Sequence, residues 1–365
     1  MVTKVARAAG TTDARRWTPG QHSLVRVGVG IATIGHAIGL VASAALAPSA
    51  TTWAACAATI AGASAVALGW QPRTGAALAA LGLLAAGGLA ETSVGLPTVL
   101  TVALLVWVAA PPPPPTWSLA TRSAVDPGAS WRLSPGLDRL GRALGVLASA
   151  LLASEPSSEA SVGVWASIAA LCVVLDGFVP PVALRRFLAP TALLALLVAL
   201  FLAATAGFVP AALLAWLAAW APRTVAAVAT DHGEIVFYDG NCGLCHGAVR
   251  FLMAEDADGT AFRFAPLHGP TFLERVPEGD RDGLPDSVVV LTADGRLLWQ
   301  FAAVRHLLAR LGGLWGGLDW LLAPVPRGLG DRVYEAIARV RHRLFARPKD
   351  ACPLLPPELR ARMLA

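Results

Sequence analysis

The chain has 365 residues, of which 55% are hydrophobic and 15% are charged, and its mean hydropathy is +0.59. These values lie outside the range of soluble globular proteins and predict that part of the chain lies in a membrane. The formal net charge is +5, but the arginines flank apolar segments or dot helical faces without forming a basic tract. We therefore expect no nucleic acid among the partners.

Apolar segments fill the first 225 residues, and each membrane-spanning helix needs about 20 mostly apolar residues. The uncharged stretch 187–221 would make a single helix about 52 Å long, so we divide it at Gly207 and Pro210. The sequence then predicts an all-α transmembrane domain over residues 1–225. Its eight expected spans are 27–47, 52–70, 75–90, 95–110, 140–153, 162–180, 187–204 and 207–221.

Lysine and arginine set the expected orientation of these spans. With eight spans, every lysine and arginine of the connecting segments falls on one side of the membrane, together with the N-terminus. The loops on the other side carry Glu91, Glu155 and Glu159 instead. The positive-inside rule then predicts a multi-pass protein of a bacterial-type inner or plasma membrane. Both the N-terminus and residues 230–365 are expected in the cytoplasm.

Two ionisable residues fall within the predicted spans. An ionisable group at membrane depth is costly, which makes His36 and Asp176 candidates for a function. The structural alternative is that His36 forms a hydrogen bond to a neighbouring helix and that Asp176 lies close to the inner interface.

From residue 230 onward the composition is that of a soluble domain. The run 234–238 predicts a strand that ends at Asp239–Gly240, and a helical pattern follows it through 244–257. A second strand is expected at 262–267, a hairpin with an Asp294–Gly295 turn at 287–301, and a helix at 302–312. The expected order is β-α-β-α-β-β-α.

Cys242 and Cys245 lie at the junction of the first strand and the first helix of this domain. A helix N-terminus stabilises a thiolate, and two cysteines three residues apart can close a disulfide. We predict that Cys242 is the exposed, more acidic nucleophile and that Cys245 resolves the mixed disulfide. Asp239 is either an acid–base group or the residue that ends the strand.

Two alternatives to redox chemistry remain for the cysteine pair. One is a zinc site, which needs four ligands, whereas His246, His268 and Cys352 stand at unsuitable spacings from the pair. The other is an inert pair without activity. We expect no metal and no cofactor. Cys352 is either a third redox thiol or a buried residue.

The blocks "VFYDGNCGLCHGAVRFL", "FRFAPL", "DSVVVLTADGRLLWQFAAVRHLLARLG" and "DRVYEAIARVRHRLF" resemble the DCC family of thiol-disulfide oxidoreductases. The family is named for an Asp-x-x-Cys-x-x-Cys pattern, which Asp239, Cys242 and Cys245 match. The resemblance implies a thioredoxin-like α/β domain with a C-terminal helical extension over 230–365, and it implies catalytic roles for these three residues. The membrane half is weakly similar to horizontally transferred transmembrane domains.

These observations give two hypotheses of different classes. The first is a membrane-anchored protein-disulfide reductase whose Cys242/Cys245 pair exchanges with a protein or small-molecule disulfide. The second is a membrane transporter or lipid-handling protein with a regulatory redox domain. A thiol relay across the bilayer is disfavoured, because Cys56 and Cys172 lie singly on different spans.

A helix is expected near the end of the chain, from about Gly328 to Phe345. It has an apolar stripe, with arginines on the other faces and two tryptophans, Trp315 and Trp320, just before it. The stripe consists of Val333, Ile337, Val340 and Leu344. It is expected either to pack on the domain's own sheet or to lie at the membrane–water interface.

Overall fold

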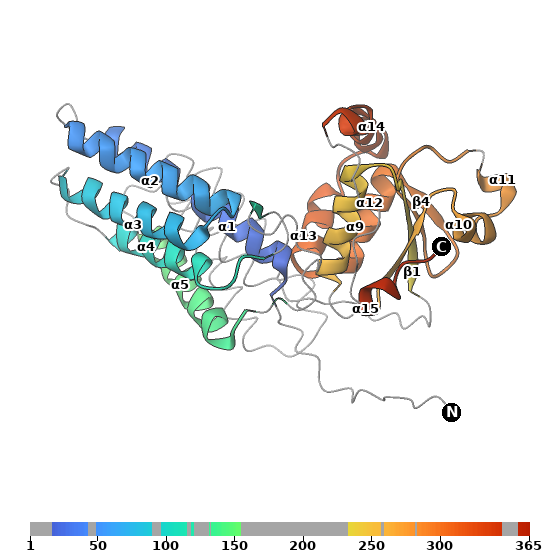
Figure 1. Ribbon diagram of the computed structural model, residues 1–365, viewed down its shortest axis with the longest axis horizontal. Coiled ribbons are helices and arrows are strands. Elements are labelled where there is room, and N and C mark those ends of the chain that lie inside the picture. The colour runs from blue at the N-terminus through green and yellow to red at the C-terminus, as the bar shows by residue number, and fades with distance from the viewer. Residues whose placement is uncertain are drawn as a thin grey trace.

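The computed structural model describes residues 17–42, 49–89, 96–114, 118–119, 131, 133–154, 233–256, 259–281, 283–344 and 357–365. Figure 1 shows a group of helices, α1 to α5, at one end and a sheet with its own helices at the other. The spans expected at 162–180, 187–204 and 207–221 lie outside the described residues.

The N-terminal region is helical, as predicted. Five of the expected spans overlap helices, although α1 begins about eight residues earlier than the span expected there. Ser49 starts α2 by accepting a hydrogen bond from the backbone N–H of Thr52, and Gly69 ends it with a φ of 65°. The helices are α1 (Pro19–Ala42), α2 (Ala50–Leu68), α3 (Pro72–Leu89), α4 (Leu96–Ala109) and α5 (Pro135–Ser154).

Within the described residues, two helical segments are long and apolar enough to cross a membrane, Pro19–Val41 and Ala50–Leu68. A third apolar segment, Thr98–Ala109, is shorter. Inside this group of helices His36 forms a 3.2 Å hydrogen bond with the Thr98 hydroxyl, which is the structural role anticipated for it. Two apolar helices are weak evidence for a membrane, so the complete multi-span arrangement stays a prediction.

The C-terminal part contains a small mixed sheet with the order β2-β1-β3-β4. β1 runs parallel to β2 and antiparallel to β3, which in turn pairs antiparallel with β4 through the predicted hairpin. The register places Val236 of β1 opposite Phe264 and Val290. The strands are β1 (Glu234–Tyr238), β2 (Phe262–Pro266), β3 (Val289–Leu291) and β4 (Leu297–Trp299).

Helices cover both faces of this sheet (Figure 1). α9 (Gly243–Glu255) and α12 (Gln300–Leu311) pack on one face around Val236, Phe264 and Leu307, and α13 (Gly313–Leu322) follows α12. On the other face, α10 (Pro270–Arg275) contributes Phe272, and the short α11 (Glu278–Arg281) follows it. The apolar cores on both faces confirm the α/β class predicted for this region.

The last long helix, α14 (Arg327–Leu344), does not pack its apolar stripe on the sheet. Val333, Ile337 and Val340 are 54%, 51% and 42% exposed, so that expectation is wrong. Another face of α14 turns inward instead, because a Cβ at Gly330 would overlap the Phe301 ring of α12. With that close approach, Val333 and Val340 of the stripe face outward, whereas Ile337 also lines a cavity between α9, α12 and α14.

The C-terminal tail runs beside β2. The N–H of Phe264 donates to the carbonyl of Arg362 at 2.9 Å, and the N–H of Leu364 donates to Phe264 at 2.7 Å. Arg362 also reaches the buried Asp256 carboxylate at 2.6 Å. The tail, with the short α15 (Pro357–Arg360) before it, thus closes an edge of the sheet that would otherwise be open.

The two ends of the molecule meet at Glu255, the last residue of α9. Its carboxylate accepts the N–H of Gly20, in the first turn of α1, at 2.8 Å, and the indole N–H of Trp315 at 2.6 Å. A Cβ at Gly20 would lie 2.7 Å from this carboxylate oxygen, which is why the position suits glycine. Trp315, for which the membrane–water interface was one of two alternatives, is buried in this junction.

Candidate functional site

The cysteine pair lies where β1 gives way to α9. Asp239 closes the turn between them: its side chain accepts the N–H of Asn241 at 2.8 Å, and its carbonyl accepts the N–H of Cys242 at 3.3 Å. Cys242 is the N-cap residue of α9, and Cys245 lies in its first turn. Both are free thiols, so the structure describes the dithiol form of the pair.

The burial of the two thiols is the reverse of what the sequence predicted. Cys242 is fully buried, and Cys245 is the half-buried one. The expectation of an exposed Cys242 is therefore wrong. The expectation failed because the spacing of the two cysteines carries no information about the segments that cover them.

The electrostatics of the pair distinguish the two thiols. The pKa of Cys245 is raised to about 12, chiefly by burial and then by a hydrogen bond to Cys242 and the negative charge of that sulfur. Cys245 is thus the thiol that keeps its proton beside the Cys242 sulfur. The nearby Arg341 guanidinium acts in the opposite direction and lowers the pKa of Cys245.

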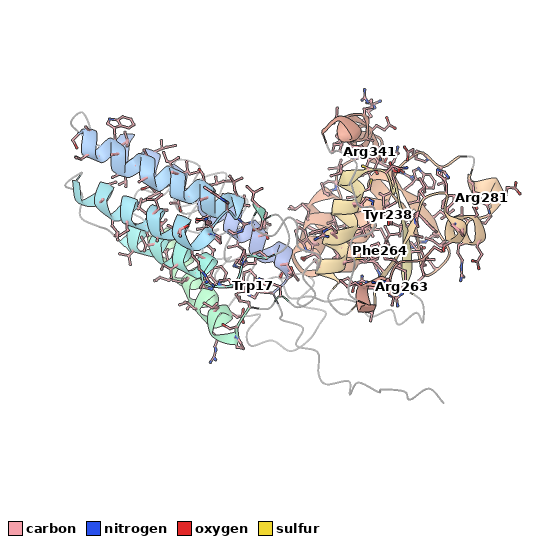
Figure 2. The ribbon with its side chains drawn as sticks, in the orientation of Figure 1. Trp17, Tyr238, Arg263, Phe264, Arg281 and Arg341 are labelled. Atoms are coloured by element: carbon pink, nitrogen blue, oxygen red, sulfur yellow. The ribbon has the colours of Figure 1, made fainter. Side chains whose placement is uncertain are left out.

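Arg341 of α14 is the cation of this site, and Figure 2 labels it above the sheet near Tyr238. Its side chain is buried, and its Nη2 donates to Asp239 at 3.3 Å and to Asp286 at 2.9 Å. Both cysteine sulfurs lie close enough to raise the pKa of this guanidinium. The arrangement places one guanidinium between the carboxylate of the motif and the two sulfurs.

The rest of α14 is held over the site by its own contacts. The Tyr334 hydroxyl accepts the backbone N–H of Val288 at 2.9 Å, and the Asp331 carboxylate accepts the N–H of Phe301 at 3.3 Å. Burial raises the pKa of Tyr334. These contacts link α14 to the start of β3 and to α12, so that it covers the cysteine pair.

His246 supports the turn beside the cysteines. Its Nε2 forms a 2.9 Å hydrogen bond with the Gly240 carbonyl, and its ring stacks edge-on against Tyr238 with centroids 5.5 Å apart. Among the described residues, no group of three or more His, Cys, Asp or Glu side chains is arranged to hold a metal ion. Cys352 lies outside the described residues.

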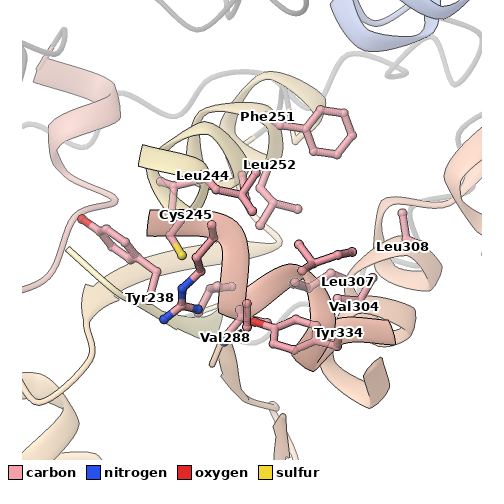
Figure 3. A pocket seen from close by; sticks show the side chains of 16 residues that line it. Tyr238, Leu244, Cys245, Phe251, Leu252, Val288, Val304, Leu307, Leu308 and Tyr334 are labelled. Atoms are coloured by element: carbon pink, nitrogen blue, oxygen red, sulfur yellow. Dashed lines mark hydrogen bonds between the residues drawn. The ribbon is translucent and has the colours of Figure 1, made fainter. Parts of the chain in front are cut away.

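An apolar cavity of about 230 Å³ adjoins the pair, with Cys245 in its wall. Figure 3 shows Leu244 and Leu252 of α9 on one side of it and Val304 and Leu307 of α12 on the other. α14 contributes Tyr334, Ala338 and Arg341 to the wall. The cysteine pair is therefore reached from a hydrophobic space rather than from a polar cleft.

Sequence reasoning missed Arg341, Tyr334 and Asp286. Arg341 was assigned to a solvent-facing side of α14, because the apolar stripe next to it was the stronger helical pattern. One signal was available: Tyr334, Ala338 and Arg341 are spaced by four and three residues and therefore share one helix face. Only tertiary packing decides which of the two faces turns inward.

Comparison with known proteins places this site in a family. The family model described as DCC1-like thiol-disulfide oxidoreductase matches residues 236–347. The "Uncharacterized protein YuxK" of Bacillus subtilis (strain 168) is 33% identical over 135 residues, which cover 36% of this chain and 93% of the relative. The "DCC family protein At1g52590, chloroplastic" of Arabidopsis thaliana is 27% identical over 135 residues, covering 37% of this chain and 77% of the relative. No solved structure matches the chain.

The C-terminal region is thus of the thiol-disulfide oxidoreductase class. A close cysteine pair at a helix N-terminus agrees with that class. The chain belongs to the DCC1-like thiol-disulfide oxidoreductase family, which confirms the resemblance seen in the motif blocks. The match begins at residue 236, within β1, so the N-terminal helices lie outside it.

Proposed function

We propose that the protein is a membrane-anchored thiol-disulfide oxidoreductase in which Cys242 and Cys245 reduce a disulfide substrate. The observation that carries this proposal is the pair of hydrogen-bonded thiols at the N-terminus of α9, with the Arg341 guanidinium beside both sulfurs. A helix N-terminus and a nearby cation both favour thiolate, which is the nucleophile in disulfide exchange.

The proposed reaction has two steps. The Cys242 thiolate, which is itself buried and is approached past the half-buried Cys245, attacks one sulfur of the substrate, forms a mixed disulfide and releases the other sulfur as a thiolate. Cys245 then loses its proton and attacks the Cys242 sulfur, which releases the second substrate thiolate and leaves a Cys242–Cys245 disulfide. The substrate gains two electrons and the pair loses two, so a dithiol reductant must restore the pair afterwards.

Asp239 is the proton acceptor in this scheme. The charge of its carboxylate is among the causes that raise the pKa of Cys245, which places it close to that thiol. Because Cys245 holds its proton so tightly, a neighbouring base assists the second step. Asp239 also closes the turn before Cys242 and orients Arg341, so it has a positioning role in addition.

The proposed anchor is the N-terminal helical region. Large apolar side chains of α1 to α4 point outward, as expected of helices that face lipid. Exposed examples are Ile31, Ile38, Trp53, Leu81 and Val106. We therefore retain the division into a multi-pass membrane domain over 1–225 and a thioredoxin-like redox domain over 230–365 that faces the cytoplasm.

A single-turnover experiment tests the redox proposal. The reduced protein is mixed with a 2-pyridyl disulfide, and release of 2-thiopyridone is followed together with the masses of the peptides. We expect a Cys242–Cys245 disulfide in the wild type and a stable mixed disulfide on Cys242 in Cys245→Ser. Release at the rate of the Cys242→Ala, Cys245→Ala double variant would refute the proposal.

A further inference from the structure

The cavity beside Cys245 lies between three helices. α9 supplies Leu244 and Leu252, α12 supplies Val304 and Leu307, and α14 supplies Tyr334 (Figure 3). Cys245 forms part of the wall and is hydrogen-bonded to Cys242, so anything in this space touches the redox pair. The position makes it a binding space for the group attached to a reacting sulfur.

The polar side chains Tyr334 and Arg341 in the wall of the cavity each have partners within the protein. The Tyr334 hydroxyl accepts the N–H of Val288, and the Arg341 guanidinium donates to Asp239 and Asp286. The side chains between them are aliphatic or aromatic. A polar occupant would lose its hydrogen bonds to water without replacing them, so the cavity selects an apolar one.

The charge in the wall is already neutralised within the protein. Among the residues that line the cavity, Arg341 carries a charge, and its guanidinium donates to Asp239 and Asp286, which do not line the cavity. A carboxylate on the substrate's chain would therefore lose its hydration in an apolar space without replacing it. The preferred occupant is neutral as well as apolar.

The size of the cavity limits the occupant. Its volume of about 230 Å³ exceeds the roughly 150 Å³ of an engineered apolar cavity that binds benzene. It is smaller than the roughly 300–1,000 Å³ of pockets that hold drug-sized ligands. It therefore has room for a short alkyl chain or a single ring.

We propose that this cavity binds the alkyl chain or ring of a neutral, low-molecular-weight disulfide and so selects the substrate of the cysteine pair. This inference rests on the proposed redox function. The substrate's sulfur meets the pair at the Cys245 wall while its apolar group fills the space under α14. The exchange reaction is the two-step reduction described above, with the apolar group leaving as a thiolate.

The test uses mixed 2-pyridyl disulfides that share one leaving group and differ only in the other substituent. The substituents are n-propyl, n-butyl, 2-hydroxyethyl and 2-carboxyethyl, and 2-thiopyridone release in a single turnover of the pre-reduced full chain in detergent gives the second-order rate constant that corresponds to kcat/KM. n-Propyl and 2-hydroxyethyl match in size and differ by a methyl against a hydroxyl. We expect n-propyl to exceed 2-hydroxyethyl at least tenfold, n-butyl to gain about fourfold more, and 2-carboxyethyl to be slowest.

Variants locate the preference in the cavity. Ala338→Phe fills it from α14, and Ala248→Leu narrows it from α9, since both alanines line it. Each variant should lower kcat/KM for n-propyl and n-butyl to the level of 2-hydroxyethyl, whose own rate stays within about twofold. The matched control is Ala336→Phe, at an exposed position of the same helix that does not line the cavity. It should keep the wild-type preference.

Equal rates for all four substituents would overturn the inference and leave the redox function standing. An alkyl preference that survives in both Ala338→Phe and Ala248→Leu would also overturn it. A disulfide-linked peptide with leucines beside its cysteines that reacts as fast as the n-butyl compound would assign the cavity to a protein side chain, against the inference. No release above the double-cysteine variant would refute the redox function itself.

Discussion

The two ends of the molecule treat charge and apolar surface in opposite ways. In the N-terminal helices Arg26 is fully buried and donates to the carbonyls of Val66 and Ala67 at the end of α2. Among the residues that form the five helices α1 to α5, without their connecting loops, Asp138 is the single acidic one. In the C-terminal domain, by contrast, buried or partly buried arginines meet carboxylates, as Arg362 meets Asp256 and Arg341 meets Asp239.

The difference is the one expected if the N-terminal helices lie in lipid and the C-terminal domain lies in water, as proposed. A helix that faces lipid satisfies its few polar groups through backbone carbonyls and neighbouring helices, and it turns apolar side chains outward. A domain that faces water turns apolar side chains inward and pairs each buried charge, because an unpaired one is costly. The contrast therefore supports a lipid environment for the N-terminal helices and an aqueous one for the C-terminal domain. Four predictions test it.

The largest expected effect is all-or-none and concerns the membrane. The full chain should remain with membranes through high-salt and alkaline washes and should leave them only with detergent. Residues 230–365 expressed alone should appear in the soluble fraction. Immunoblots of the fractions measure both outcomes. A full chain that is soluble without detergent would remove the basis of the comparison.

Next in size is the buried pairing of Asp256. Its carboxylate accepts Arg362 at 2.6 Å and the N–H groups of Ala261 and Phe262 at 3.2 Å each. Asp256→Ala leaves these donors unpaired, so we expect it to lower the free energy of unfolding by about 3–5 kcal/mol. Urea titration followed by tryptophan fluorescence measures the change.

The control for Asp256 is Asp294→Ala, which removes an exposed ion pair with Arg296. Water screens an exposed pair, so its loss should change the free energy of unfolding little. Similar losses from Asp256→Ala and Asp294→Ala would contradict the view that buried charge in this domain depends on its partner.

A smaller effect should appear in the titration of Cys245. Its hydrogen bond to Cys242 and the charge of that sulfur both raise the pKa, so Cys242→Ala should move it from about 12 toward 9. A lower pKa means more thiolate at any pH between these values, and alkylation of Cys245 should begin at lower pH. Iodoacetamide labelling against pH, resolved by mass spectrometry, measures the shift. An unchanged labelling profile would show that burial alone sets this pKa.

The smallest expected effect concerns α14, which exposes apolar side chains although the C-terminal domain otherwise turns them inward. Val333, Ile337 and Val340 are exposed beside Arg332 and Arg339. Residues 230–365 should bind anionic vesicles weakly, at about 1 kcal/mol per basic residue, and should lose that binding at high salt. Flotation with anionic and neutral vesicles at two salt concentrations measures it. Val333→Asp should weaken it, and equal binding to both kinds of vesicle would contradict the prediction.

Local patterns in the sequence were enough to place the cysteine pair. The alternation in β1, the Asp239–Gly240 turn and the apolar face of α9 are each encoded within a few residues, so the strand-to-helix junction was predicted where it lies. The Asp294–Gly295 hairpin was predicted for the same reason.

Features set by distant segments were not predictable in this way. The burial of Cys242 and the contact of Arg341 with Asp239 depend on how α14 lies across α9 and α12, some 90 residues later in the chain. The apolar stripe of α14 pointed to the wrong inward face, because helical periodicity identifies an apolar face but not what covers it. Gly330, whose missing side chain permits the approach to Phe301, carried no such signal by itself.

The hydrogen bond between the Glu255 carboxylate and the N–H of Gly20 means that α9 sets the distance between α1 and the cysteines. One end of this helix is fastened to the first turn of α1, and the other end carries the cysteines. Twelve residues of rise at 1.5 Å each set the two ends about 18 Å apart. If α1 lies in the bilayer and the pair reduces disulfides, as proposed, the cysteines are held at a fixed distance from the first turn of α1, and a substrate disulfide must reach that distance from the membrane.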